Sequence, residues 1–215
     1  MHLCQLSGGL RIGELVQLRK EDLTPKDGRF IVEIPSKIAK NHKGRITFFS
    51  FESSKYLKQL LKKLDDNDQI FGTNENSFHS EINEEQIFRR ALNRAGLTKK
   101  YSITGRFKIN THSLRAYFIT KASRHDPNLA HFLSGQPGKI YLAQYDRLTD
   151  EEMYEIYLEI EPDLIIESSN KDKLVIEKLK KDKSEQQSMH ADAIVTMGDR
   201  VLNLEKELLE LKSKK

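Results

Sequence analysis

Two side chains that can hold an anion, His112 and Arg115, stand three residues apart at the start of a helical pattern. Residues at positions i and i+3 share one face of a helix, so both side chains can point at the same anion. A tyrosine a few turns later, Tyr141 or Tyr145, can approach that anion from the other side. Residues 111–145 therefore predict half of a site that holds a DNA phosphate and attacks it.

Such an attack requires an in-line nucleophile, cations on the non-bridging oxygens and an acid for the departing oxygen. A tyrosine can serve as the nucleophile and hold the cleaved end covalently, so we expect no metal ion and no nucleotide cofactor. Arginine suits the clamp, because its planar fork matches phosphate oxygens in pairs. His125 and His131 have no carboxylate or cysteine at ligand spacing and do not predict a metal site.

The remaining candidates lie upstream. Arg11 and Glu14 are three residues apart on a second predicted helix. Lys37, Lys40 and Lys43 lie in a basic, glycine-containing turn between two β-rich runs, which predicts a hairpin with a charged tip.

The order of these motifs resembles the catalytic domain of the tyrosine recombinases, which include phage integrases and Xer-type resolvases. The motifs are, in order, Gly9-Leu-Arg11-Ile-Gly-Glu14-Leu, the lysine-bearing hairpin, His112-x-x-Arg115, Leu-x-Gly and a tyrosine. The resemblance covers roughly residues 3–165. It implies site-specific cleavage and rejoining of double-stranded DNA through a 3′-phosphotyrosine, by subunits that self-associate as a tetramer on DNA. The alternative is a catalytically inactive remnant that binds DNA or assembles through its C-terminal helix.

The resemblance also implies roles for these residues. Arg11 and Arg115 would clamp the phosphate, and Glu14 would orient Arg11. His112 would contact the phosphate or assist proton transfer. Lys40 is favoured as the general acid over Lys37 and Lys43, because it stands five residues before Arg45, as the family's lysine stands before the arginine that opens the next strand.

Tyr145 is favoured as the nucleophile, because it lies nine residues after Gln136, the position that follows the Leu-x-Gly turn. Tyr141 is expected to pack in the core instead. The family usually has His or Trp where this chain has Gln136. Glutamine can donate a hydrogen bond to a phosphate oxygen but cannot gain a charge, and His131, one turn earlier, could substitute for it.

The charge is unevenly distributed over the 215 residues. Residues 1–150 hold 25 Lys and Arg against 16 Asp and Glu, a net charge of +9, whereas residues 151–166 hold six acids and no base. A basic body suits a polyanionic partner. The sequence has one cysteine, no recognisable signal peptide and no apolar run long enough to cross a bilayer. These features predict a cytoplasmic, nucleoid-associated protein with no membrane partner.

The expected fold class is mainly α with a small antiparallel β-sheet (α+β), like a tyrosine recombinase catalytic domain, plus a C-terminal coiled-coil helix. We expect a catalytic domain at 1–166, a polar linker at 167–190 and a coiled-coil helix at 191–213. From the resemblance, the catalytic domain is expected to be incomplete at its N-terminus, as in a truncated or split archaeal-type integrase. The heptad seam, whose coiled-coil partner the sequence does not specify, consists of Ile194, Met197, Val201, Leu204, Leu208 and Leu211.

Local patterns predict the other elements. Residues 1–6 are too short for a helical layer, and residues 21–28 carry turn chemistry. The expected strands are 30–34 and 45–49. The expected helices are 10–19, 53–64, 84–95, 113–124, one starting at Asp126-Pro127, and one starting at Thr149 and ended by Pro162. The helix over 84–95 is expected to be capped by Asn83 and to bury Ile87, Phe88, Ala91 and Leu92, and Thr111 is expected to cap the helix over 113–124. After Pro162, residues 164–166 could dock on a neighbour.

Overall fold

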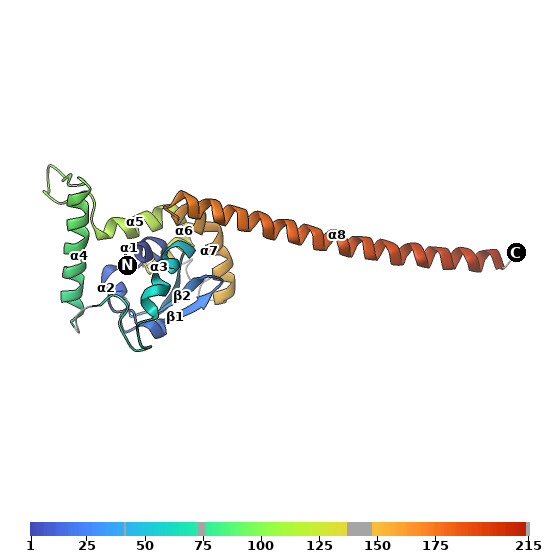
Figure 1. Ribbon diagram of the computed structural model, residues 1–215, viewed down its shortest axis with the longest axis horizontal. Coiled ribbons are helices and arrows are strands. Elements are labelled where there is room, and N and C mark those ends of the chain that lie inside the picture. Colours follow the sequence, from blue (N-terminus) through green and yellow to red (C-terminus); the bar gives the residue numbers. More distant parts are fainter. Residues whose placement is uncertain (41, 73–75, 137–147, 214–215) are drawn as a thin grey trace. The chain divides into compact units, whose positions relative to one another are not determined.

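Helices dominate the chain and surround one small antiparallel sheet, which confirms the predicted fold class (Figure 1). The computed structural model describes residues 1–40, 42–72, 76–136 and 148–213. The chain divides into two units, Met1–Glu167 and Ser168–Lys215. No helix in the described ranges has the length and apolarity needed to cross a membrane.

The sheet has the order β1-β2-β3 and consists of β1 (Leu23–Lys26), β2 (Arg29–Ile34) and β3 (Arg45–Phe49). The hairpin between β2 and β3 was predicted, and its register places Ile34 opposite Arg45. The turn predicted over residues 21–28 is interrupted by β1: Glu21 and Asp22 lie in a short 3-10 turn, and Asp27 and Gly28, with φ of 45° and 81°, turn the chain after the strand. Pro25 is tolerated in β1 because an edge strand leaves one side of its backbone unpaired.

Two apolar clusters flank the sheet, and adjacent residues of β3 point into different ones. Phe49 belongs to a cluster with Leu10, Leu15 and Val32, whereas Phe48 packs with the helices of the second cluster. This follows from the alternation of side chains along a strand. The helical members of the second cluster include Phe118, Leu129, Leu133, Tyr157, Ile160 and Leu164.

The N-terminal region differs from the predicted pattern. Helix α1 (His2–Gly8) forms although its residues looked too few, because Cys4 and Leu6 are buried and tertiary packing supports a short helix. The predicted helix over 10–19 is reduced to α2 (Ile12–Leu15), followed by a short 3-10 turn, η1 (Lys20–Asp22). Gly9, with φ of 65°, ends α1 and lets the chain turn before Arg11.

Helix α3 (Phe51–Leu61) begins after the capping residue Ser50. Helix α4 (Ser77–Arg94) begins seven residues earlier than predicted, because Asn76 rather than Asn83 caps it. The expected burial of Ile87, Phe88, Ala91 and Leu92 was also wrong: Ser80 is the buried residue among those described in α4. In Figure 1, α4 (green) lies away from the sheet. Phe88 and Leu92 are half-buried, and the Phe88 ring packs edge-on against His2 of α1.

The described residues of the first unit also form α5 (Thr111–Ala122), α6 (Pro127–Ser134) and α7 (Asp150–Leu164). The caps Asp126 and Thr149 were predicted, whereas α5 is capped by Asn110 rather than Thr111.

Helix α7 continues past Pro162, contrary to the prediction. Near its end, Glu161 is buried and accepts from Arg29 at 2.7 Å, and Leu164 is buried in the second cluster. These contacts offset the cost of a proline in a last helical turn. Because Leu164 and Ile165 are buried in the chain itself, only Ile166, 60% exposed, is free to dock on a neighbour as predicted.

The second unit is one helix, α8 (Ser168–Ser213), which runs without a break through the segment predicted as a linker. Along the predicted seam, Ile194, Met197, Val201 and Leu204 are between 53% and 70% exposed.

Candidate functional site

Arg11 and Glu14 form a reciprocal pair at the start of α2. The carboxylate of Glu14 accepts from the Arg11 backbone N–H at 3.0 Å and from its Nη1 at 2.8 Å. The pairing closes the first turn of a four-residue helix, in the way that a capping box does. The predicted relation between these two residues is therefore a direct ion pair.

Arg45, at the start of β3, joins this pair. Its Nη2 and Nη1 donate to the two carboxylate oxygens of Glu14 at 2.7 and 3.1 Å, and both side chains are at least 94% buried. Burial by itself raises the pKa of Glu14, but hydrogen bonds and the charges of Arg45 and Arg11 outweigh this and hold the pKa below its ordinary 4.5. The sequence reasoning had used Arg45 only as a marker for Lys40, and its position opening a strand was the one available signal.

The C-terminus of α6 accepts three arginines on three successive carbonyl oxygens. Arg45 Nε donates to Leu133 at 3.0 Å, Arg115 Nη1 donates to Ser134, and Arg11 Nη2 donates to Gly135 at 2.8 Å. A helix C-terminus carries partial negative charge, which stabilises cations there. The Leu-x-Gly turn thus draws together arginines that lie far apart in the sequence.

Arg115 is the most deeply buried of the three, with 2% of its surface exposed, and its Nη1 also donates to the Gly9 oxygen at 2.5 Å. Burial, together with the charges of Arg11 and Arg45, lowers the pKa of Arg115 to about 10. It stays charged at neutral pH. Of the three guanidinium groups, Arg11 and Arg45 pair with the Glu14 carboxylate and Arg115 pairs with carbonyl oxygens, so the cluster carries an excess of positive charge suited to an anion.

A cavity of about 430 Å³ opens beside this cluster and is lined by Arg11, Lys40 and His112. His112 lies in the first turn of α5 with its side chain exposed, and Lys40 is likewise exposed. Lys37 and Lys43 do not line the cavity, and Lys37 lies instead in the field of Asp22. The structure therefore brings together the residues predicted from the N-terminal helix, the hairpin and α5.

The opposite wall of this cavity is acidic. Glu81 and Glu85 of α4 line it, and an oxygen of Glu81 lies close to Gly13 of α2. Burial and the charge of Glu85 raise the pKa of Glu81. Sequence reasoning missed Glu81 because α4 was predicted to begin after it, at Glu84, and it missed Glu85 because no local pattern shows that this face of α4 meets the cavity.

Gln136 is held by His131. Its Oε1 accepts from His131 Nδ1 at 2.6 Å, and its backbone N–H donates to the His131 oxygen at 3.0 Å. The amide oxygen is thereby occupied, which leaves the amide NH₂ as the group that can donate to a phosphate. His131 therefore positions Gln136. Tyr141 and Tyr145 lie outside the described residues, and the choice between them stays a prediction.

No cluster of three or more His, Cys, Asp or Glu side chains is placed to hold a metal ion in the part of the chain that the structure describes.

The described residues combine a mainly helical fold and a small antiparallel sheet with a cluster of arginines at the end of α6. The sequence matches the phage integrase family over residues 1–131, so the chain belongs to that family.

Solved structures similar to this chain include two recombinases. The XerH site-specific recombinase in a pre-cleavage complex with difH substrate is 24% identical, with a TM-score of 0.49 over 72% of this chain and 44% of that one. The XerA recombinase is also 24% identical, with a TM-score of 0.47 over 73% of this chain and 55% of that one. This chain therefore spans about half the length of these recombinases. No curated protein matches the sequence.

Proposed function

We propose that this chain is a site-specific DNA recombinase domain that cleaves and rejoins DNA through a 3′-phosphotyrosine. The observation that carries the proposal is the excess of positive charge at the end of α6, where Arg11 and Arg45 pair with the single carboxylate of Glu14 and the buried Arg115 is held by carbonyl oxygens. Partly desolvated guanidinium groups of this kind suit a phosphodiester, because each can donate two hydrogen bonds to the oxygens of the anion.

In the proposed reaction, the Tyr145 hydroxyl gives its proton to His112 as its oxygen attacks phosphorus, the bond to the 5′-oxygen breaks, and a 3′-phosphotyrosine forms. Arg11 and Arg115 hold the non-bridging oxygens, with Glu14 orienting Arg11. Lys40 gives a proton to the departing 5′-oxygen. Attack of a 5′-hydroxyl on the phosphotyrosine reverses the step and rejoins a strand.

His112 and Gln136 complete the proposed clamp. The exposed His112 imidazole lines the same cavity as Arg11 and Lys40, within a region that a bound phosphate could fill. Gln136 donates its amide NH₂, the orientation that the hydrogen bond from His131 favours.

The test uses duplex DNA with a nick that traps the covalent intermediate, and a randomised central sequence to supply the unknown target site. Adducts are separated on denaturing gels and their DNA is sequenced. We expect an adduct from the wild type and from Tyr141→Phe, and none from Tyr145→Phe. The yield should be the same in EDTA, because the proposed chemistry uses no metal. A folded protein that binds the duplex but gives no adduct would contradict the proposal.

A second function, assembly through α8, is favoured by the exposed seam at Ile194, Met197, Val201 and Leu204. In this alternative, the chain is a catalytically inactive DNA-binding or assembly module, and α8 forms a coiled coil that supports a tetramer on DNA. A coiled coil is stabilised by burying apolar side chains at a and d positions against a partner helix.

Sedimentation equilibrium tests the assembly role. Replacing both Ile194 and Val201 by Glu should dissociate the wild-type oligomer, because it buries charge in the seam. Val195→Glu with Leu202→Glu is the matched control, since both residues are exposed but lie off the seam. Equal dissociation by both pairs, or a monomeric wild type, would reject the seam.

A further inference from the structure

Residues 97–110, between α4 and α5, form a small projecting hairpin. The backbone N–H of Tyr101 donates to the Arg106 oxygen and that of Lys108 donates to the Lys99 oxygen, both at 2.9 Å. An isolated bridge joins Lys100 and Phe107 between these bonds. The hairpin therefore has a defined register and a tip.

The hairpin tip exposes an apolar side chain among cations. Ile103 is 96% exposed and Tyr101 is 52% exposed. Residues 86–110 hold seven Lys and Arg and no acid. Among the described residues, none of the four hairpin cations forms an ion pair with an acidic side chain; they are Lys99, Lys100, Arg106 and Lys108.

Aromatic rings fix this hairpin to α4 and organise its cations. Arg89 of α4 and Lys100 both lie over the Phe107 ring, at 5.0 and 4.7 Å from its centroid. Lys108 lies over the Tyr101 ring at 5.5 Å. A cation over the face of an aromatic ring is attracted by the ring, so these contacts favour positions in which the cations lie against the hairpin.

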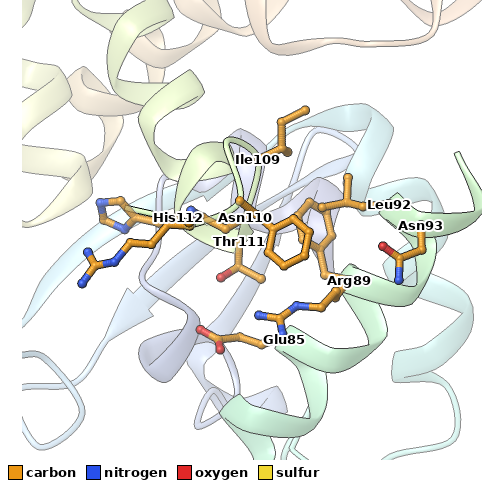
Figure 2. Close-up of a pocket in the computed structure, with 12 residues that line it drawn as sticks. Glu85, Arg89, Leu92, Asn93, Ile109, Asn110, Thr111 and His112 are labelled. Atoms are coloured by element: carbon orange, nitrogen blue, oxygen red, sulfur yellow. The ribbon is translucent and has the colours of Figure 1, made fainter. Parts of the chain in front are cut away.

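The hairpin also adjoins the candidate site. A cavity of about 680 Å³ separates α4 from residues 105–112, and Figure 2 shows its two walls, with Glu85 and Arg89 on α4 and Asn110 and His112 on the other side. Glu85, Thr111 and His112 also line the cavity beside Arg11. A polyanion held at Arg11 would therefore extend naturally toward the hairpin.

We propose that this hairpin is a second binding surface for duplex DNA, beyond the phosphate that is cleaved. Its cations bind backbone phosphates beside the scissile one, and Ile103 enters a groove as an apolar wedge. Lys and Arg side chains that bind phosphates position a protein on a duplex, and exposed apolar side chains are used in this way to wedge into DNA. The inference rests on the proposed function for its partner, duplex DNA.

The charge half of the inference is tested by equilibrium binding of a fluorescent duplex over a range of salt concentrations. All proteins carry Tyr145→Phe, so no adduct forms. In the hairpin variant, Lys99, Lys100, Arg106 and Lys108 become Gln. We expect at least tenfold weaker binding. The slope of log K against log salt concentration should become shallower by about 0.9 for each phosphate that the variant no longer neutralises.

The matched control neutralises four exposed lysines around α3, namely Lys55, Lys58, Lys62 and Lys63. It makes the same change in net charge and should leave the salt dependence close to that of the parent protein. If both quadruple variants weaken binding equally, or neither does, the hairpin does not bind DNA specifically and the inference fails.

Ile103 provides a test that does not disturb folding, because its side chain is almost fully exposed. Ile103→Ser should weaken binding several-fold without altering the salt dependence, whereas Ile103→Val should bind like the parent. Unchanged binding by Ile103→Ser would show that Ile103 does not enter a DNA groove. Preferential binding of the parent to phosphatidylserine vesicles, with no affinity for duplex, would overturn the inference in favour of a lipid surface.

The two proposals can fail separately. A wild type that forms the tyrosine adduct, with hairpin variants that bind DNA normally, rejects only the role of the hairpin. Hairpin-dependent binding by a wild type that forms no adduct rejects only the recombinase chemistry.

Discussion

The carboxylate of Glu14 accepts both terminal nitrogens of Arg45, at 2.7 and 3.1 Å, while accepting Arg11 Nη1 at 2.8 Å. A strand arginine and a helix-cap arginine thus meet on one buried carboxylate. Arg45 fixes the orientation of Glu14, and Glu14 in turn fixes Arg11. Arg45 is therefore a positioning residue for the phosphate clamp.

Arg45→Met should destabilise the fold by about 3 kcal/mol, because it leaves the buried Glu14 with only one of its two charged partners. The free energy of unfolding is measured by urea denaturation. The control is Arg124→Met, in which the arginine is exposed and a change below about 0.5 kcal/mol is expected. An equally small effect of Arg45→Met would show that the pair does not hold the site together.

Glu14 should make stability depend on pH in the acid range. Its pKa in the fold lies below 4.5, so its contribution is fully present above pH 4.5 and is lost as the pH falls through the lower folded value. Glu14→Gln should be less stable than the wild type at neutral pH, and the difference should shrink below pH 4.5. Urea denaturation midpoints of both proteins, measured across this pH range, test the prediction. A stability difference between wild type and Glu14→Gln that does not vary with pH would contradict it.

Gly135→Ala should disrupt the site as well as the backbone. Gly135 has φ of 65°, and a Cβ there would lie 2.5 Å from Cζ of Arg45. We expect a loss of adduct formation and a destabilisation larger than the ~1–2 kcal/mol of a left-handed alanine. Gly96→Ala is the matched control, because its φ is 70° but its Cβ would meet nothing within 4 Å. Equal destabilisation of the two variants would mean that the close approach to Arg45 is unimportant.

Neutralising Glu81, one of the two acids that line the cavity beside Arg11, should strengthen DNA binding. Glu81→Gln takes a negative charge from the cavity beside Arg11 and Lys40, an effect on the order of 1 kcal/mol or about fivefold in Kd. Equilibrium binding of a duplex by the Tyr145→Phe protein measures it. Glu84→Gln on the same helix does not face this cavity and serves as the control. Tighter binding by both variants alike would indicate a general effect of net charge.

Much of the fold could be predicted, because strong local signals specify it. The alternating runs at 30–34 and 45–49 predicted the hairpin, and the Asp126 and Thr149 caps located two helix starts. The start of α4 could not be found in this way, because Asn76 and Asn83 are both good helix caps. The first turns of α4, where Ser80 is buried, form only in the context of the folded chain. The exposure of its apolar stripe depends on what lies beside it, which periodicity does not encode.

The sequence by itself determined the residue types and the spacing of the candidate site, which were enough to name Arg11, Glu14, Lys40, His112 and Arg115. It also determined Gln136 as the departure from the family pattern. Only the tertiary structure decided that Arg45 belongs with them, that the end of α6 accepts three arginines, and that Glu81 faces the cavity. The physical reason is that charge compensation and helix-end carbonyl groups act between segments up to 124 residues apart, and only the folded chain sets the distances between them.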